Sequence, residues 1–273
     1  AISINTREFR EVMRKPRGEI TGLVTQLLLP PLHTLCLVLF LRPEMGLGLG
    51  LILIGACPGG NISNFFSLQA RGNVALSVSL TVVVTILAPV MTPFNFEFWG
   101  SRVTYLEPLF SSISIDYLSL ARTVFLIMVV PLIGGMLLAN YRPDITRKIS
   151  SPVQTLSVLI LLAFIAFAFA GNLDIFEKHW HHVVFLVFAH NSLALLAGYI
   201  FGYASTRSIN DAKTISIETG IQNGGLGLVI VFTFFGGQGG MALVVAWWGI
   251  WDIISGLIVA QLFKKWRIAS STL

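Results

Sequence analysis

The sequence has little charge for its length. Only 11% of its 273 residues are charged, whereas hydrophobic residues make up 55%. Charged residues account for about a quarter of an ordinary soluble domain, and a disordered chain combines high charge with few apolar residues. The composition therefore excludes both classes and indicates an integral membrane protein built from helices.

Cysteine is scarce and positive charge is dilute. Cys36 and Cys57 both lie in apolar stretches and form neither a disulfide framework nor a metal-ligand pattern. The net charge of +5 is spread along the chain, so no nucleic-acid partner is expected. The sequence shows no nucleophile–base arrangement. Neither an enzyme nor an organic cofactor is therefore expected.

Eight apolar segments lack Lys and Arg entirely. A helix needs about 20 apolar residues to span a bilayer, and the runs are continuous, unlike the alternating strands of a membrane barrel. The predicted fold is an all-α integral membrane protein with eight transmembrane helices at 20–41, 45–70, 73–96, 123–140, 151–173, 183–206, 214–240 and 241–263.

Lys and Arg predict the orientation, because loops rich in them stay in the cytoplasm. Of the 18 Lys and Arg residues, 14 fall in the first, third, fifth, seventh and ninth stretches outside these segments. We therefore expect a multi-pass protein of the cell (inner) membrane, in contact with the lipid bilayer, with both termini of this chain in the cytoplasm.

Two segments of the sequence resemble each other. Residues 58–78 read PGGNISNFFSLQARGNVALSV, and residues 223–245 read NGGLGLVIVFTFFGGQGGMALVV. The predicted spans that carry them run in opposite directions through the membrane. This arrangement is typical of the inverted-topology repeats of transporters.

The repeat predicts how the chain is organised. We expect one transporter unit over 1–273, with 20–96 as the remnant of a first repeat and 123–263 as the second. The seventh span follows three others in its half, whereas the second span follows only one. Two helices are therefore expected to be missing before the first span, in a truncated chain or in a natural short form.

Both repeated spans are interrupted near their middle. Residues 57–61 read CPGGN, and residues 222–225 read QNGG. Proline removes a backbone donor, and paired glycines favour non-helical conformations. Interrupted helices are tolerated within a membrane where they line a cavity or are buried in protein. Their carbonyl ends attract cations and their amide ends attract anions.

Glu218 is an acid in the interior of the seventh span. An ionised acid there costs about 2.5–3.5 kcal/mol, and no predicted span contains a Lys or Arg to pair with it. A bound cation or a proton is therefore its expected partner. Sodium prefers oxygen ligands, and the oxygen-bearing side chains near the two breaks are Ser63, Asn64, Ser77, Thr81, Gln222 and Asn223.

Other polar residues in the spans leave more than one interpretation open. Asp252 is a second carboxyl group within a span, and it could join a polar network, carry a proton or be inert. We expect His33 and the pair His190-Asn191 to pack between helices or line a pore, because no second soft ligand lies at metal-binding spacing.

GACPGGNISNFFSLQARGNVALSVSLT at 55–81, followed by ETGIQNGGLG at 218–227, resembles the bile acid:sodium symporter family. The family has ten spans in two inverted repeats of five. The resemblance implies that this chain holds three plus five of them, including two discontinuous crossing helices. It also implies core helices at 45–96 and 183–240, with the remaining helices belonging to a panel.

The resemblance further implies two bound sodium ions as cofactors. The first sodium site would comprise Ser63, Asn64, Ser77, Thr81 and Glu218. The second would comprise Gln26, Glu218 and Gln222, with the backbone carbonyls of Thr219 and Ile221. The substrate-binding positions would be Asn61, Ile62, Asn223 and Asp252, although family members commonly carry His-Asn where this chain has Asp252-Ile253.

The expected function is sodium-coupled symport of an organic anion by alternating access. The substrate would be a bile-acid-like steroid or a small carboxylate such as pantoate or pyruvate. Two alternatives remain open at this point: a proton-coupled carrier that uses Glu218 and Asp252, and a short form that does not transport. The sequence does not determine the oligomeric state, for which a homodimer is one option.

Overall fold

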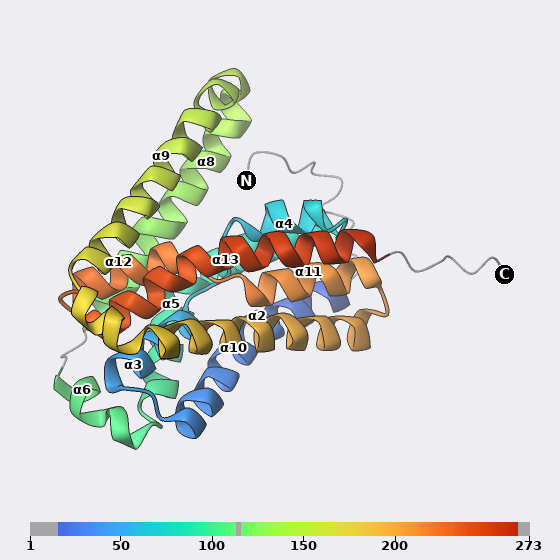
Figure 1. Cartoon of the computed structure of the whole chain (residues 1–273). Helices are drawn as coiled ribbons and strands as arrows, with labels where there is room; N and C mark the ends of the chain where they lie inside the picture. Colours follow the sequence, from blue (N-terminus) through green and yellow to red (C-terminus); the bar gives the residue numbers. More distant parts are fainter. Residues whose placement is uncertain (1–15, 113–115, 267–273) are drawn as a thin grey trace.

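A computed structural model describes residues 16–112 and 116–266, and every regular element in these ranges is helical (Figure 1). Of the predicted unit over 1–273, residues 1–15, 113–115 and 267–273 lie outside the described residues. The α-helices are α2 (Pro16–Leu41), α3 (Met45–Ala56), α4 (Ser63–Gln69), α5 (Val74–Gly100), α6 (Glu107–Ser112), α7 (Tyr117–Val124), α8 (Val130–Tyr141), α9 (Pro143–Ala170), α10 (Leu173–Thr206), α11 (Ile209–Gly220), α12 (Gly224–Phe234) and α13 (Gly239–Lys265). The short 3₁₀ turn η1 (Thr104–Leu106) and the π turn η2 (Phe125–Val129) complete the set.

Within the described residues, 6 helical runs are long and apolar enough to cross a membrane. They overlap six of the predicted spans. The other two predicted spans, 45–70 and 214–240, are each divided into two helices, α3 with α4 and α11 with α12.

The long helices extend beyond the apolar segments from which they were predicted. α10 begins at Leu173, ten residues before the predicted start at 183, and includes Glu177 and Lys178. α9 likewise begins at Pro143 and includes Arg147. Glu, Lys and Arg are good helix formers, so the helices continue into charged sequence where the apolar pattern stops.

Two helices, α8 and α9, form a hairpin that projects from the other described helices, which we call the body (Figure 1). In the body, α10, α11 and α13 run side by side, and every residue of α3 after Met45 is buried. The hairpin of α8 and α9 projects away from the body, and only 11% of the apolar window of α9 is buried. The body therefore contains most of the packed core among the described residues, and α9 adds Ile165 and Ala168 near its end.

Glycines allow α3 and α13 to pack backbone against backbone. A Cβ atom added at Gly240 would lie 2.7 Å from the backbone carbon of Gly46, and one added at Gly50 would lie 2.9 Å from the Cα of Met241. Small residues are typical of close contacts between membrane helices. This close contact fixes the first half of α3 against the first turn of α13.

Candidate functional site

The first interruption lies between α3 and α4. Cys57 is extended, with φ −68° and ψ 149°, as expected for a residue that precedes a proline. Pro58 and two glycines follow, and α4 begins only at Ser63. The break that the sequence predicted at 57–61 therefore lies in the non-helical stretch of the structure.

The second interruption lies between α11 and α12. α11 ends at Gly220, and Ile221 is extended, with φ −97° and ψ 105°. The Asn223 side chain then caps α12, because its Oδ1 accepts a hydrogen bond of 2.9 Å from the Leu226 amide. The break is shorter than the first but is again close to its predicted position at 222–225.

The two interruptions meet and pair through their backbones. Gly59 and Gln222 form an isolated antiparallel bridge. The Gly60 amide donates to the Ile221 carbonyl at 2.9 Å, and the Asn223 amide donates to the Pro58 carbonyl at 2.8 Å. Backbone groups freed by the breaks therefore satisfy each other, as a membrane interior requires.

Glu218 lies one turn before this crossing and is fully buried, with 0% of its surface exposed. Its Oε1 accepts hydrogen bonds from Ser63 Oγ at 2.6 Å and from Ser77 Oγ at 2.5 Å. Its Oε2 accepts one from Gln26 Nε2 at 2.8 Å. Thr81 Oγ1 lies 3.4 Å from Oε2 and 3.5 Å from Oε1. Four elements thus converge on one carboxyl group: α2, α4, α5 and α11.

Asn64 completes this cluster. Its Oδ1 accepts a hydrogen bond from Ser77 Oγ at 2.9 Å, and its Nδ2 lies 3.2 Å from Thr81 Oγ1. The structure therefore brings together all the residues expected at the first sodium site. Within residues 16–112 and 116–266, the hydrogen-bond partners of the Glu218 carboxylate include no Lys, Arg or His.

The residues expected at the second sodium site lie between this cluster and the crossing. Gln26 and Gln222 are each 3% exposed, and the Oε1 atom of each has no hydrogen-bond partner among residues 16–112 and 116–266. Gln222 Nε2 donates to the Thr219 carbonyl at 3.0 Å, and the Ile221 carbonyl accepts from Gly60. Two buried amide oxygens are therefore available beside the crossing.

The residues expected to bind substrate differ in how much of each is exposed. Asn61 and Ile62 are exposed between the bridge and α4. Asn223 is half-buried at the start of α12. Asp252 of α13 is buried and faces the Gln222 backbone and the Trp248 side chain. Its Oδ1 atom has no hydrogen-bond partner in the part of the chain that the structure describes.

Two polar residues at the crossing were not predicted as site residues. Thr25 accepts a hydrogen bond of 3.0 Å from Thr219 Oγ1. The Asn191 side-chain amide donates a hydrogen bond of 2.9 Å to the carbonyl of Gly220, at the end of α11. An Asn within an apolar span is itself a signal of a polar contact, but the sequence does not identify the partner.

A third group lies between α2 and α10. The rings of His33 and His190 lie 4.2 Å apart, and His190 Nε2 is hydrogen-bonded to the Thr34 hydroxyl. His190 also packs edge-on against Trp248. This arrangement agrees with the expected packing role of the two histidines.

Interrupted helices that cross within a set of long apolar helices, beside a buried polar cluster, define a helical, multi-pass membrane transporter. The family described as "Sodium Bile acid symporter family" matches residues 1–179. The chain belongs to this family, whose members are symporters and not enzymes.

Several relatives share the similarity. The chain is 28% identical over 264 residues to the "Uncharacterized sodium-dependent transporter YocS" of Bacillus subtilis, covering 97% of this chain and 79% of that protein. It is 29% identical over 234 residues to the "Probable sodium/metabolite cotransporter BASS2, chloroplastic" of Oryza sativa subsp. japonica, covering 86% of this chain and 54% of that protein. With "P3 protein" of Mus musculus it shares 25% identity over 223 residues, or 81% and 46% of the two chains. The chain thus spans about half the length of the plant and mouse relatives.

Proposed function

We propose that the protein is a sodium-coupled symporter of an organic anion that works by alternating access. The observation that carries the proposal is the setting of Glu218, which is buried among hydroxyl and amide groups without a basic partner among its hydrogen bonds in the described residues. An ionised acid in a membrane interior needs a counter-charge. A sodium ion supplies that charge and accepts the neighbouring oxygens as ligands.

We assign two sodium ions to this region. The first would bind the Glu218 carboxylate with oxygens of Ser63, Asn64, Ser77 and Thr81. The second would bind Glu218 and the unpartnered amide oxygens of Gln26 and Gln222, with the carbonyls of Thr219 and Ile221. The names of the Bacillus and Oryza relatives, which refer to sodium, support this choice of ion.

The substrate would bind on the side of the crossing where the N-terminal amide groups of α4 and α12 lie. Asn61 and Ile62 are accessible there, and Asn223 and Asp252 lie near Gln222. Amide ends of helices attract anions. A bile-acid-like steroid or a small carboxylate such as pantoate or pyruvate is the proposed class, and the family description supports an organic anion.

The proposed arrangement in the membrane has eight crossings, with each pair of interrupted helices counted as one. Segments 20–96 and 123–263 would be the two inverted repeats, and 45–96 with 183–240 would form the core. The projecting hairpin of α8 and α9 would belong to the panel against which the core rocks. Both termini of the chain would face the cytoplasm, as the distribution of Lys and Arg predicts.

The test is uptake by proteoliposomes that contain the purified chain. Uptake of labelled taurocholate, pantoate and pyruvate should be measured with an inward sodium gradient and with an equal choline gradient. We expect at least one anion to accumulate only with sodium. Two sodium ions and one monovalent anion together carry one net positive charge inward. An inside-negative potential should therefore increase this uptake, because moving one charge gains about 2.3 kcal/mol per 100 mV. Equal uptake in sodium and choline would refute sodium coupling.

A proton-coupled carrier is the alternative, and it is favoured by buried Asp252, whose Oδ1 has no hydrogen-bond partner among the described residues. A carboxyl group in this setting can hold a proton instead of a metal ion. Uptake driven by an inward pH gradient in sodium-free buffer would support this alternative. Uptake that requires sodium at every pH would reject it.

A further inference from the structure

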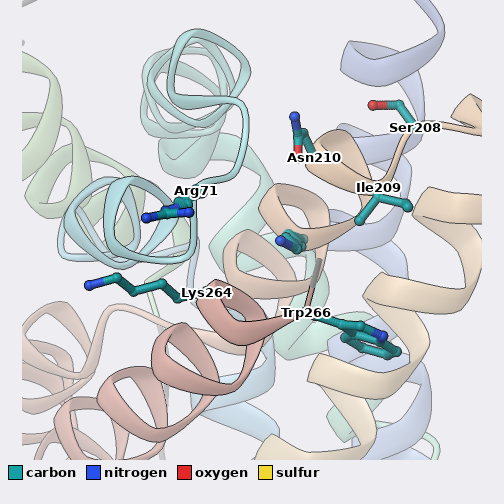
Figure 2. Close-up of a pocket in the computed structure, with 7 residues that line it drawn as sticks. Arg71, Ser208, Ile209, Asn210, Lys264 and Trp266 are labelled. Carbon is teal, nitrogen blue, oxygen red and sulfur yellow. The ribbon is translucent and has the colours of Figure 1, made fainter. Parts of the chain in front are cut away.

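A cavity lies between the ends of α4, α11 and α13 (Figure 2). Its volume of about 440 Å³ falls within the range of roughly 300–1,000 Å³ that is usual for small-ligand sites. Its lining residues are Arg71, Ser208, Ile209, Asn210, Lys213, Lys264 and Trp266. The sequence places this cavity on the predicted cytoplasmic side, outside the proposed sodium and substrate sites.

Three basic residues converge on this cavity from three different elements. Arg71 follows α4, Lys213 belongs to α11 and Lys264 belongs to the last turn of α13. None of the lining residues is acidic. Like charges gathered in one hollow create a positive potential that attracts an anion.

Lys213 is the most buried of the three basic residues. It is only 4% exposed, and within the described residues its ammonium group makes one hydrogen bond, a long contact of 3.4 Å from Nζ to the Ala70 carbonyl. The neighbouring charge of Arg71 repels its ammonium group. Lysine is almost never fully buried without a partner, so an anion in the cavity would supply the partner that Lys213 lacks.

The backbone at Arg71 is consistent with a role for its side chain. Arg71 has a φ of 56°, in the left-handed region that glycine adopts without strain. The adjacent Gly72 is required for another reason, because a Cβ there would lie 2.6 Å from Thr214 Oγ1. Arg71, at the strained position next to Gly72, therefore has a positively charged side chain that lines the cavity.

The start of α11 adds to the positive character of the cavity. Ser208 is the cap of this 12-residue helix, and Ile209 and Asn210 are its first residues. A helix N-terminus carries a partial positive charge and donates amide hydrogens to anions. Trp266, at the edge of the cavity, is a residue type that concentrates at membrane interfaces.

A cavity at the opposite end of α10 has a different character. It has a volume of about 360 Å³ and places Glu44 and Asp174 beside Lys178 and His179. Its acidic and basic side chains can balance each other. Of these two cavities, only the one between α4, α11 and α13 has no acidic side chain among its described lining residues.

We propose that the cavity between α4, α11 and α13 binds a phosphate-class anion, supplied by an acidic phospholipid headgroup or by a free phosphate-bearing solute. The anion would neutralise Lys213 and Arg71 and would hold the cytoplasmic ends of both interrupted helices together. This inference does not depend on the proposed sodium coupling.

The test is thermal unfolding of the purified full chain in neutral detergent at constant ionic strength. One series adds inorganic phosphate against chloride, and a second adds short-chain phosphatidylglycerol against short-chain phosphatidylcholine. A ligand that binds only the folded state raises its stability, so at least one series should raise the unfolding temperature. A response to phosphatidylglycerol alone would identify a headgroup site, and a response to phosphate as well would identify a site open to solutes.

Variants connect the response to the cavity. Lys213→Gln should weaken the apparent affinity for the anion by about tenfold or more, as expected for a lost charged hydrogen bond. Lys264→Gln changes an exposed residue and provides the same test if the Lys213 variant does not fold. Lys178→Gln, in the opposite cavity, is the matched control and should respond like the unaltered protein.

Two results would overturn the inference. One is an unaltered protein that neither phosphate nor phosphatidylglycerol stabilises beyond its matched control. The other is a full response in both the Lys213 and Lys264 variants. A parallel sodium titration of the same samples separates these failures from a failure of sodium coupling.

Discussion

The side-chain amide of Gln26 donates to two oxygens of Glu218, the carboxylate Oε2 at 2.8 Å and the backbone carbonyl at 2.9 Å. The two residues are 192 positions apart in the chain and belong to α2 and α11. Nε2 makes both bonds, and the Oε1 atom of Gln26 has no hydrogen-bond partner in the part of the chain that the structure describes. The interaction thus positions the acid and leaves one oxygen available to a cation.

Replacing Glu218 with Gln should abolish the sodium response. The substitution keeps the size of the side chain but removes the negative charge that we propose the cation neutralises. Thermal unfolding in detergent should no longer shift with sodium, and sodium-driven uptake should be lost. Glu177→Gln, an exposed acid of α10, is the matched control. A Glu218 variant with unchanged sodium dependence would remove the assignment.

Replacing Ser77 with Ala should weaken sodium binding. The Ser77 hydroxyl lies 2.5 Å from Glu218 Oε1, and a hydrogen bond to a charged group contributes about 1.5–3 kcal/mol. We therefore expect a sodium affinity roughly 10–100 times weaker, because 1.4 kcal/mol corresponds to a factor of ten. The control is Ser79→Ala on the same helix, whose hydroxyl makes no hydrogen bond to Glu218. Equal effects of the two substitutions would contradict the role of Ser77.

Adding a methyl group at the crossing should destabilise the protein. A Cβ at Gly60 would lie 3.0 Å from the Gln222 carbonyl oxygen, which belongs to the backbone and cannot swing aside. Gly60→Ala should lower the free energy of unfolding by about 1–3 kcal/mol and reduce uptake.

Gly135→Ala in α8 is the control for the Gly60 variant. A Cβ at Gly135 meets nothing within 4 Å, so stability should stay the same or rise, by up to about 1 kcal/mol. Both variants can be compared by chemical or thermal unfolding in one detergent. A Gly60 variant as stable as the Gly135 variant would show that the crossing adapts easily.

Asn191→Ala should lower stability without removing a sodium ligand. The Gly220 carbonyl would lose its 2.9 Å donor, and an unsatisfied buried group costs about 1–3 kcal/mol. Sodium should still stabilise the variant. Asn140→Ala, at an exposed position of α8, should change stability by less than about 0.5 kcal/mol. Loss of sodium binding in the Asn191 variant would indicate a direct role at the ion site.

The two interruptions could be predicted because their causes are local. Pro58 forces the preceding residue out of the helical conformation, and paired glycines mark both breaks. Glu218 could be singled out for a similar reason, since an acid without a base in an apolar span is costly wherever it points. In both cases the physical signal lies in the residue itself.

The contacts between helices could not be predicted in this way. Thr25 and Asn191 act through partners on α11 that depend on how the helices pack, and Gln26 was singled out only through the family resemblance. The beginning of α10 was also placed too late, at 183, because a hydropathy pattern ends where charge begins whereas the helix starts at Leu173. Family membership rests on the comparison with known proteins.

The backbone pairing between Pro58–Gly60 and Ile221–Asn223 has a mechanical consequence. These bonds involve no side-chain atoms. They would therefore join the two interrupted helices whichever substrate the surrounding side chains bind. A shift of one interruption must move the other with it or break these backbone hydrogen bonds, which is costly within a membrane. The two interrupted helices are therefore joined as one unit, and in the proposed transport cycle the proposed ion ligands and substrate ligands would move together.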